Sequence, residues 1–247
     1  MRYYFIALQF LTIIPLPFKV RFENKDLGRA MALFPLAGLT LGFLLVGCNA
    51  LLEPYLPRPV ADLFLILVIT VVTGALHLDG LADVCDGLAA RGGRERFLEV
   101  MKDSRVGAVG VVGLVMGLLL KYQALLHIPL AYKSEALLLF PLLARFSQVQ
   151  MAVGARNARE EGLGALFIQG AGLWQFAAAE IITLTSAWLL FGVRGIACCL
   201  ISFVATWLLK IWFQRRLGGI TGDVLGCASE LNEIICLLAL LAMLGGR

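Results

Sequence analysis

The stretch VGAVGVVGLVMGLLLKYQALL, residues 106–126, carries one charged side chain, Lys121. Its length lies within the roughly 17 to 25 apolar residues that a helix needs to cross a membrane. Comparable apolar runs recur at about 3–17, 30–52, 60–78, 136–155, 172–191, 195–213 and 231–245. The first run is short and ends in prolines, so it can cross, lie in the interface or re-enter. The sequence therefore predicts an all-α fold, a polytopic transmembrane helical bundle of seven or eight segments, with residues 1–247 forming a single domain.

The composition also indicates a membrane protein. Hydrophobic residues make up 60% of the chain and charged residues 15%, whereas soluble domains have about 25% charged residues. Lysines and arginines concentrate in four alternate connections between the apolar runs. These connections contain Lys19, Arg21, Lys25 and Arg29; Arg91, Arg94, Arg96, Lys102 and Arg105; Arg156 and Arg159; and Arg215 and Arg216. Because cytoplasmic loops carry the excess of positive charge, we expect these four connections to face the cytoplasm.

Residues 78–88, LDGLADVCDGL, place three carboxylates at the end of an apolar run. Positions i, i+4 and i+7 share one face of a helix, so Asp79, Asp83 and Asp86 are expected to form one stripe. Adjacent negative charges repel one another unless a cation lies between them. Mg²⁺ prefers oxygen ligands and commonly shares substrate phosphates. The pattern predicts a magnesium site, and a solvated acidic helix end is the plainer alternative.

Residues 101–110, MKDSRVGAVG, lie where the next apolar helix is expected to begin. Asp103 or Ser104 is a candidate N-cap for that helix. Unpaired N–H groups at a helix N-terminus, together with Lys102 and Arg105, can bind phosphate oxygens. The segment predicts a phosphate site, or alternatively an ordinary capped helix that basic residues anchor.

A third polar stretch is GGITGDVLGCASELNE, residues 218–233. Its acids, Asp223, Glu230 and Glu233, have the spacing i, i+7 and i+10, which places them on one face if the helix is continuous. They can build one site with the acids of residues 79–86 only if the bundle brings the two ends together. Both ends are expected in the cytoplasm, which permits this arrangement.

Other residues have weaker signals. His77 directly precedes the first acidic cluster, where it can orient a carboxylate or phosphate or simply pack at the interface. Arg145 lies inside an apolar run, where a charge needs a partner or must extend to the surface. Gly113 and Gly117 form a GxxxG-like face through which two copies of the chain could associate.

Together these motifs closely resemble the cobalamin synthase family, the adenosylcobinamide-GDP ribazoletransferases. The resemblance rests on GALHLDGLADVCDGLAA at 74–90, MKDSRVGAVG at 101–110, GGITGDVLGCASELNE at 218–233, LQFLTIIPLP at 8–17 and FPLAGLTLG at 34–42. It implies an inner-membrane enzyme, requiring Mg²⁺, that completes the nucleotide loop of cobalamin with its active site facing the cytoplasm. Such an enzyme joins adenosylcobinamide-GDP to α-ribazole or its 5′-phosphate, giving adenosylcobalamin or its 5′-phosphate and releasing GMP.

The resemblance and the residue chemistry together suggest roles. Asp79, Asp83 and Asp86 are expected to hold one or two Mg²⁺ ions against the pyrophosphate. Asp86 is the first choice for accepting the proton of the attacking hydroxyl. The expected catalytic residues are Asp86, Asp83, Lys102 and Arg105, and the expected substrate-binding residues are Lys102, Asp103, Arg105, Asp223, Glu230 and Glu233. The expected partners are the two substrates and membrane lipid, with a homo-oligomer as an option and no nucleic acid.

Two other functions compete with this interpretation. CDP-alcohol phosphotransferases of phospholipid synthesis also use helix-borne aspartates in a membrane bundle. DGLADVCDGLAAR, residues 79–91, begins like their motif, but Asp83 stands where they have arginine, and their downstream GxxxDxxxD element is missing. A cation-coupled transporter would bind its ion near the middle of the membrane. Here the acids gather at one face, and no inverted repeat is visible.

Overall fold

The computed structural model describes residues 1–16, 20–159 and 162–245, so Lys19 of the first basic connection lies outside the described residues. The expected all-α fold is confirmed, because regular structure in the described residues is helical apart from one isolated bridge between Asn157 and Ile220. The α-helices are α1 (Arg2–Leu11), α2 (Asn24–Ala30), α3 (Phe34–Leu52), α4 (Arg58–Val72), α5 (Leu76–Ala89), α6 (Arg94–Val100), α7 (Ala108–His127), α8 (Lys133–Ala152), α9 (Leu163–Gly170), α10 (Leu173–Phe191), α11 (Val193–Leu217) and α12 (Gly222–Leu244). Short 3₁₀ turns, Met31–Leu33 and Leu130–Tyr132, precede α3 and α8.

A multi-pass helical bundle is confirmed, but the expected count of seven or eight membrane segments is not. In the described part of the chain, five helical segments are long and apolar enough to cross a membrane: Asn24–Leu52, α7, α10, α11 and α12. The pair α4 and α5 makes a sixth if it forms one broken span. The difference comes from the first apolar run and from α8.

The first run does not form a long helix. α1 has only 10 residues, and the Arg2 guanidinium at its start pairs with Asp26 of α2 at 2.5 Å. Beyond its end, the N–H of Ile13 donates to the carbonyl of Val72 at 2.8 Å. A helix of this length is too short to cross a membrane, so α1 does not count as a membrane span. α8 has 20 residues, but polar side chains interrupt it and its neighbours bury nearly all of it.

The acidic stretch begins a helix of its own. α4 ends at Val72, and Gly74 and Ala75 adopt φ angles of 61° and 54°. This left-handed pair turns the chain by 89° between α4 and α5. Ala75 is the one described non-glycine residue with a positive φ, a conformation that costs an L-residue free energy. The three aspartates consequently lie along α5 rather than at the end of a straight membrane helix.

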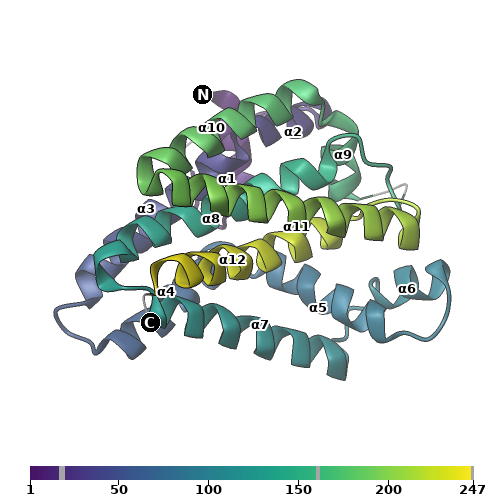
Figure 1. Ribbon diagram of the computed structural model, residues 1–247. Helices are drawn as coiled ribbons and strands as arrows, with labels where there is room; N and C mark the ends of the chain where they lie inside the picture. Colours follow the sequence, from purple (N-terminus) through teal and green to yellow (C-terminus); the bar gives the residue numbers. More distant parts are fainter. Residues whose placement is uncertain (17–19, 160–161, 246–247) are drawn as a thin grey trace.

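α5 and the beginning of α12 approach each other closely (Figure 1). A Cβ atom on Gly80 would lie 2.6 Å from the carbonyl oxygen of Asp223, so only glycine fits there. On the neighbouring helix α7, a Cβ on Gly113 would lie 2.5 Å from the sulfur of Cys85. The GxxxG-like face of Gly113 and Gly117, which was one option for pairing two copies, therefore packs against α5 within the chain.

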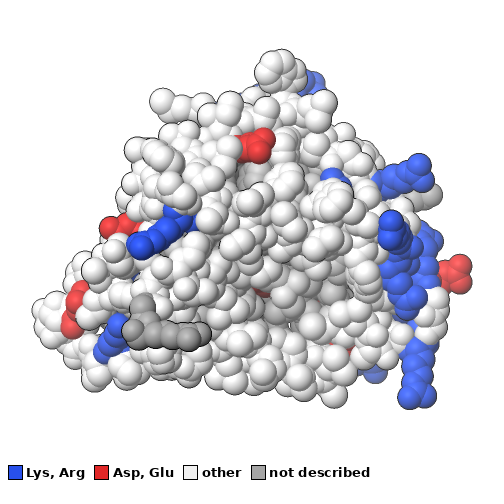
Figure 2. Space-filling model, in the orientation of Figure 1, with Lys and Arg blue, Asp and Glu red and all other residues white. Residues whose placement is uncertain are grey.

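Three of the four basic connections lie together at one end of the bundle. Arg94 donates to the carbonyls of Leu217 at 2.6 Å and Ala158 at 3.0 Å. Arg216 donates to the carbonyl of Gly92 at 3.2 Å. Figure 2 shows lysine and arginine side chains gathered along this end, over α6 and the C-terminal end of α11.

Candidate active site

A cavity of about 270 Å³ lies where α5, α9 and the beginning of α12 meet. Its polar side chains come from segments far apart in the sequence. They are His77, Asp79, Gln148, Arg159, Thr221 and Asp223. The bundle thus brings the first and third polar stretches together, which is the condition for a shared site.

The acidic side of the cavity combines two helices. The Arg159 guanidinium pairs with the Asp223 carboxylate at 2.8 Å. Asp83 is half-buried and close enough to Asp223 and Asp79 for their charges to act on it. Asp79 is exposed, and its carboxylate has no hydrogen-bond or ion-pair partner among the described residues. Three carboxylates and one arginine therefore form a polar face that can meet a charged substrate.

Asp86 has a structural contact. Its two oxygens accept hydrogen bonds from the N–H groups of Gly107 and Gly110, each at 2.7 Å. These N–H groups lie at the N-terminus of α7, whose N-cap is Gly107. The prediction that Asp103 or Ser104 caps this helix is therefore wrong. Glycine has no side chain to accept a hydrogen bond, so a carboxylate of another helix supplies the cap.

Replacing Asp86 with alanine should destabilise the protein by about 0.5–2 kcal/mol, the usual effect of losing a helix cap. The measurement is thermal unfolding in detergent. Asp79→Ala on the same helix is the control, because its carboxylate contacts no described partner. Equal unfolding temperatures for Asp86→Ala and the wild type would contradict the capping role.

The predicted phosphate-binding residues lie on an exposed turn outside the cavity lining. Arg105 holds Asp103 through a pair of hydrogen bonds at 3.0 and 2.7 Å. This contact lowers the pKa of the Asp103 carboxyl to about 2. Lys102 is exposed beside them, without an ion pair in the described structure. Arg105 must therefore release Asp103 before it can bind a phosphate with the same nitrogen atoms.

Glu230 and Glu233 lie away from the cavity, in a buried ionic cluster. The Lys121 ammonium contacts both carboxylates at 2.6 Å. Arg145 pairs with Glu233 at 3.0 Å and donates to the Ser229 hydroxyl at 2.9 Å. The cluster joins α7, α8 and α12. Glu233 is the partner that the charge of Arg145 requires inside an apolar segment. Two positive and two negative charges balance within it.

Several residues of the cavity and of the buried ionic cluster have no clear signal in the sequence. Gln148 of α8 lines the cavity and its amide nitrogen contacts Nε2 of His77 at 2.7 Å. Arg159 was assigned only to a basic connection, yet it reaches Asp223. Lys121 is the single charged residue within residues 106–126, and this isolation in an apolar run is the sequence signal that it needs a buried partner.

The fold and the cavity define a multi-pass helical membrane protein with an acidic site at its basic end. The chain belongs to the cobalamin-5-phosphate synthase family, whose sequence profile matches residues 3–241. It is 64% identical over 247 residues to the adenosylcobinamide-GDP ribazoletransferase of Geotalea daltonii, covering 100% of this chain and 99% of that protein. It is 38% identical over 242 residues to the protein of that name from Klebsiella pneumoniae, covering 96% and 98%. The one from Acetivibrio thermocellus is 35% identical over 234 residues, covering 94% of each chain. No solved structure matches this chain.

Proposed function

We propose that this protein is an adenosylcobinamide-GDP ribazoletransferase. It joins the cobinamide phosphate of its donor to α-ribazole or α-ribazole 5′-phosphate, which forms adenosylcobalamin or its 5′-phosphate and releases GMP. The observation that carries the proposal is the full-length identity of 64% to a relative of that name. The grouping of acids from α5 and α12 around one cavity supports it.

The chemistry divides among the acidic residues by their contacts. A ribose hydroxyl of the acceptor attacks the phosphorus nearest the cobinamide, and the bond from that phosphorus to the GMP oxygen breaks. Asp79 lines the cavity and its carboxylate is free of described partners, so we assign it the hydroxyl proton. Asp86, the first choice from sequence, already accepts two N–H groups of α7, so both of its oxygens are engaged in the helix cap.

The carboxylates of the site suit magnesium only together with oxygens of the substrate phosphates. Among the described residues, no three histidine, cysteine or acidic side chains group closely enough to hold an ion by themselves. Mg²⁺ is commonly bound by one or two carboxylates plus substrate phosphates, an arrangement that Asp83 and Asp223 can provide. The ion would neutralise charge on the pyrophosphate and on the departing GMP. Asp83 and Asp223 would hold the metal, Asp79 would take the proton and Asp86 caps α7.

Removing divalent ions should abolish transfer. EDTA is expected to stop product formation by the purified protein, and excess Mg²⁺ to restore it. Asp83→Asn should raise the Mg²⁺ concentration for half-maximal activity more than about tenfold, since even indirect metal contacts have effects of this size. Asp103→Asn, on the exposed turn, is the matched control. Full activity in EDTA would contradict the metal assignment.

We further place the protein in the inner membrane with its cavity facing the cytoplasm. The gathering of basic connections at the cavity end supports this orientation, because positive loops remain cytoplasmic. Exposed apolar side chains on α10 and α11 suit contact with lipid. The four tryptophans of the chain, Trp174, Trp188, Trp207 and Trp212, are all exposed on these two helices.

Supplying two donors separately tests the proposal against its nearest alternative. Purified protein in detergent should consume adenosylcobinamide-GDP when α-ribazole is present and leave CDP-diacylglycerol with an alcohol acceptor unchanged. Turnover of only CDP-diacylglycerol would make the protein a CDP-alcohol phosphotransferase. Movement of a cation into sealed vesicles without any chemical conversion would support a transporter instead.

A further inference from the structure

The cavity combines one aromatic wall with one polar wall, and this combination identifies a ligand class. We propose that it is the acceptor site and binds the aromatic nucleoside, with the base against the aromatic wall and the ribose against the polar wall. This inference rests on the proposed function, and it goes further by deciding which substrate occupies the cavity. The corrinoid part of the donor then lies outside.

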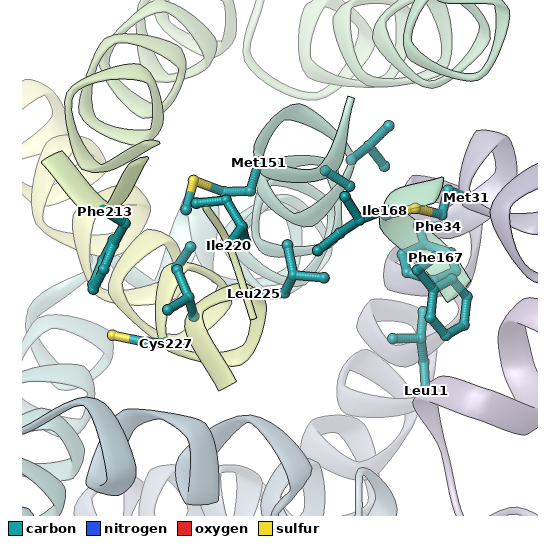
Figure 3. Close-up of a cluster of buried hydrophobic side chains, with 14 of the residues drawn as sticks. Leu11, Met31, Phe34, Met151, Phe167, Ile168, Phe213, Ile220, Leu225 and Cys227 are labelled. Atoms are coloured by element: carbon teal, nitrogen blue, oxygen red, sulfur yellow. The ribbon is translucent and has the colours of Figure 1, made fainter. Parts of the chain in front are cut away.

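Three phenylalanines form the aromatic wall: Phe10, Phe34 and Phe167. The ring centroids of Phe10 and Phe167 are 4.2 Å apart, and those of Phe34 and Phe167 are 5.6 Å apart. Figure 3 shows Phe34 and Phe167 grouped on one side, with Ile220 and Leu225 on the other. All four side chains line the cavity. A flat apolar base gains contact area and stacking energy between such surfaces.

The polar wall holds hydrogen-bond donors without acceptors. The Gln148 amide nitrogen donates to Nε2 of His77 at 2.7 Å, so the ring proton of His77 resides on Nδ1. Nδ1 has no partner in the described structure, and His77 is only 3% exposed. The Nε atom of Arg159 is also buried without a partner. Because a buried donor without an acceptor costs free energy, these two groups indicate a ligand that accepts hydrogen bonds.

A ribose satisfies both kinds of group on this wall. Each hydroxyl can donate one hydrogen bond and accept others. It can therefore donate to Asp79 or Asp223 while it accepts from His77 or Arg159. This placement also brings a ribose hydroxyl to Asp79, the residue assigned its proton. A purely apolar ligand would leave His77 Nδ1 and Arg159 Nε without an acceptor.

The volume of the cavity excludes the larger substrate. At about 270 Å³, it lies just below the usual range of roughly 300–1,000 Å³ for small-molecule sites. A two-ring base with its ribose is of this size. A corrinoid with its amide side chains and adenosyl group is several times larger. The corrinoid part of the donor therefore stays outside the cavity.

Equilibrium binding to the purified protein in detergent tests this assignment without any chemical step. The ligands are α-ribazole, its free dimethylbenzimidazole base and GDP. Phe167→Ala should raise the dissociation constants of the nucleoside and the base about tenfold, as expected for losing one stacking ring, and leave that of GDP unchanged. Phe213→Ala is the matched control, since Phe213 is as deeply buried as Phe167 but does not line the cavity. Phe213→Ala should leave the dissociation constants of all three ligands unchanged.

A second variant separates hydrogen bonding from packing. His77→Ala should weaken the binding of α-ribazole but not that of the free base, which lacks the ribose. His77→Asn keeps an N–H donor and should recover part of the affinity. Unchanged α-ribazole affinity in Phe167→Ala, or weakened GDP binding in its place, would overturn the acceptor site. Equal losses for base and nucleoside in His77→Ala would also overturn it. Absence of transfer by the wild-type protein would instead overturn the proposed function.

Discussion

Asp79→Asn is expected to lower the rate of transfer by about 10²–10⁴, the usual contribution of a positioned general base. Asparagine keeps the size of the side chain but cannot accept a proton from the attacking hydroxyl. Asp79 is exposed and has no described partner, so its loss should leave the unfolding temperature unchanged. The measurement is the initial rate of adenosylcobalamin formation at saturating concentrations of both substrates.

Asp86→Asn separates the base from the helix cap. Asparagine at position 86 retains one oxygen acceptor for the Gly107 and Gly110 N–H groups. This variant should therefore be less stable than the wild type but keep more activity than Asp79→Asn. If Asp86→Asn were the less active of two equally folded proteins, the proton would belong to Asp86, as the sequence alone suggested.

Lys121→Met should unfold the protein at a much lower temperature. Lys121 is 2% exposed and contacts Glu230 and Glu233 at 2.6 Å each. Its removal leaves Glu230 without a described cation, whereas Glu233 keeps Arg145. Breaking a buried ion pair by removing one partner costs about 3–5 kcal/mol. Thermal unfolding and the yield of monodisperse protein in detergent measure the effect.

A compensating variant distinguishes charge imbalance from lost packing. Adding Glu230→Gln to Lys121→Met leaves the balanced pair of Arg145 and Glu233, and it should recover much of the stability. Lys102→Met, on the exposed turn, should have no effect. A double variant as unstable as Lys121→Met alone would show that the ammonium matters for packing rather than for charge.

The sequence predicted the fold class, and it predicted a shared helical face for the acids of the candidate site, because both depend on local patterns. Apolar runs identified the helical membrane bundle. The spacing of Asp79 and Asp83 placed them on one stripe, and α5 is indeed helical over both. Basic connections in alternate positions suggested a common end, where Asp223 meets the first cluster.

The sequence could not predict which residues the acids of α12 contact. Asp223, Glu230 and Glu233 share a face of the continuous helix α12, yet a helix rises about 1.5 Å per residue. Glu230 therefore lies roughly 10 Å further from the cavity end than Asp223. There it meets Lys121, which is 109 positions away in the sequence. Residues on one face of a helix share a site only when they also lie at the same level along the helix axis.

Long-range contacts explain the other differences. The cap of α7 comes from Asp86, 21 residues before Gly107, so the local candidates Asp103 and Ser104 were misleading. The bend at Gly74 and Ala75 also depends on its surroundings, because alanine rarely takes a positive φ. No local sequence pattern predicts the cap of α7 or the bend between α4 and α5.

The most direct test of the central claim is the product balance of the purified wild-type protein. With adenosylcobinamide-GDP, α-ribazole and Mg²⁺, chromatography and mass spectrometry should detect adenosylcobalamin and GMP in equal amounts. The same protein without α-ribazole should release no GMP. Release of GDP instead of GMP, or no cobalamin product from well-folded protein, would contradict the proposed phosphoryl transfer.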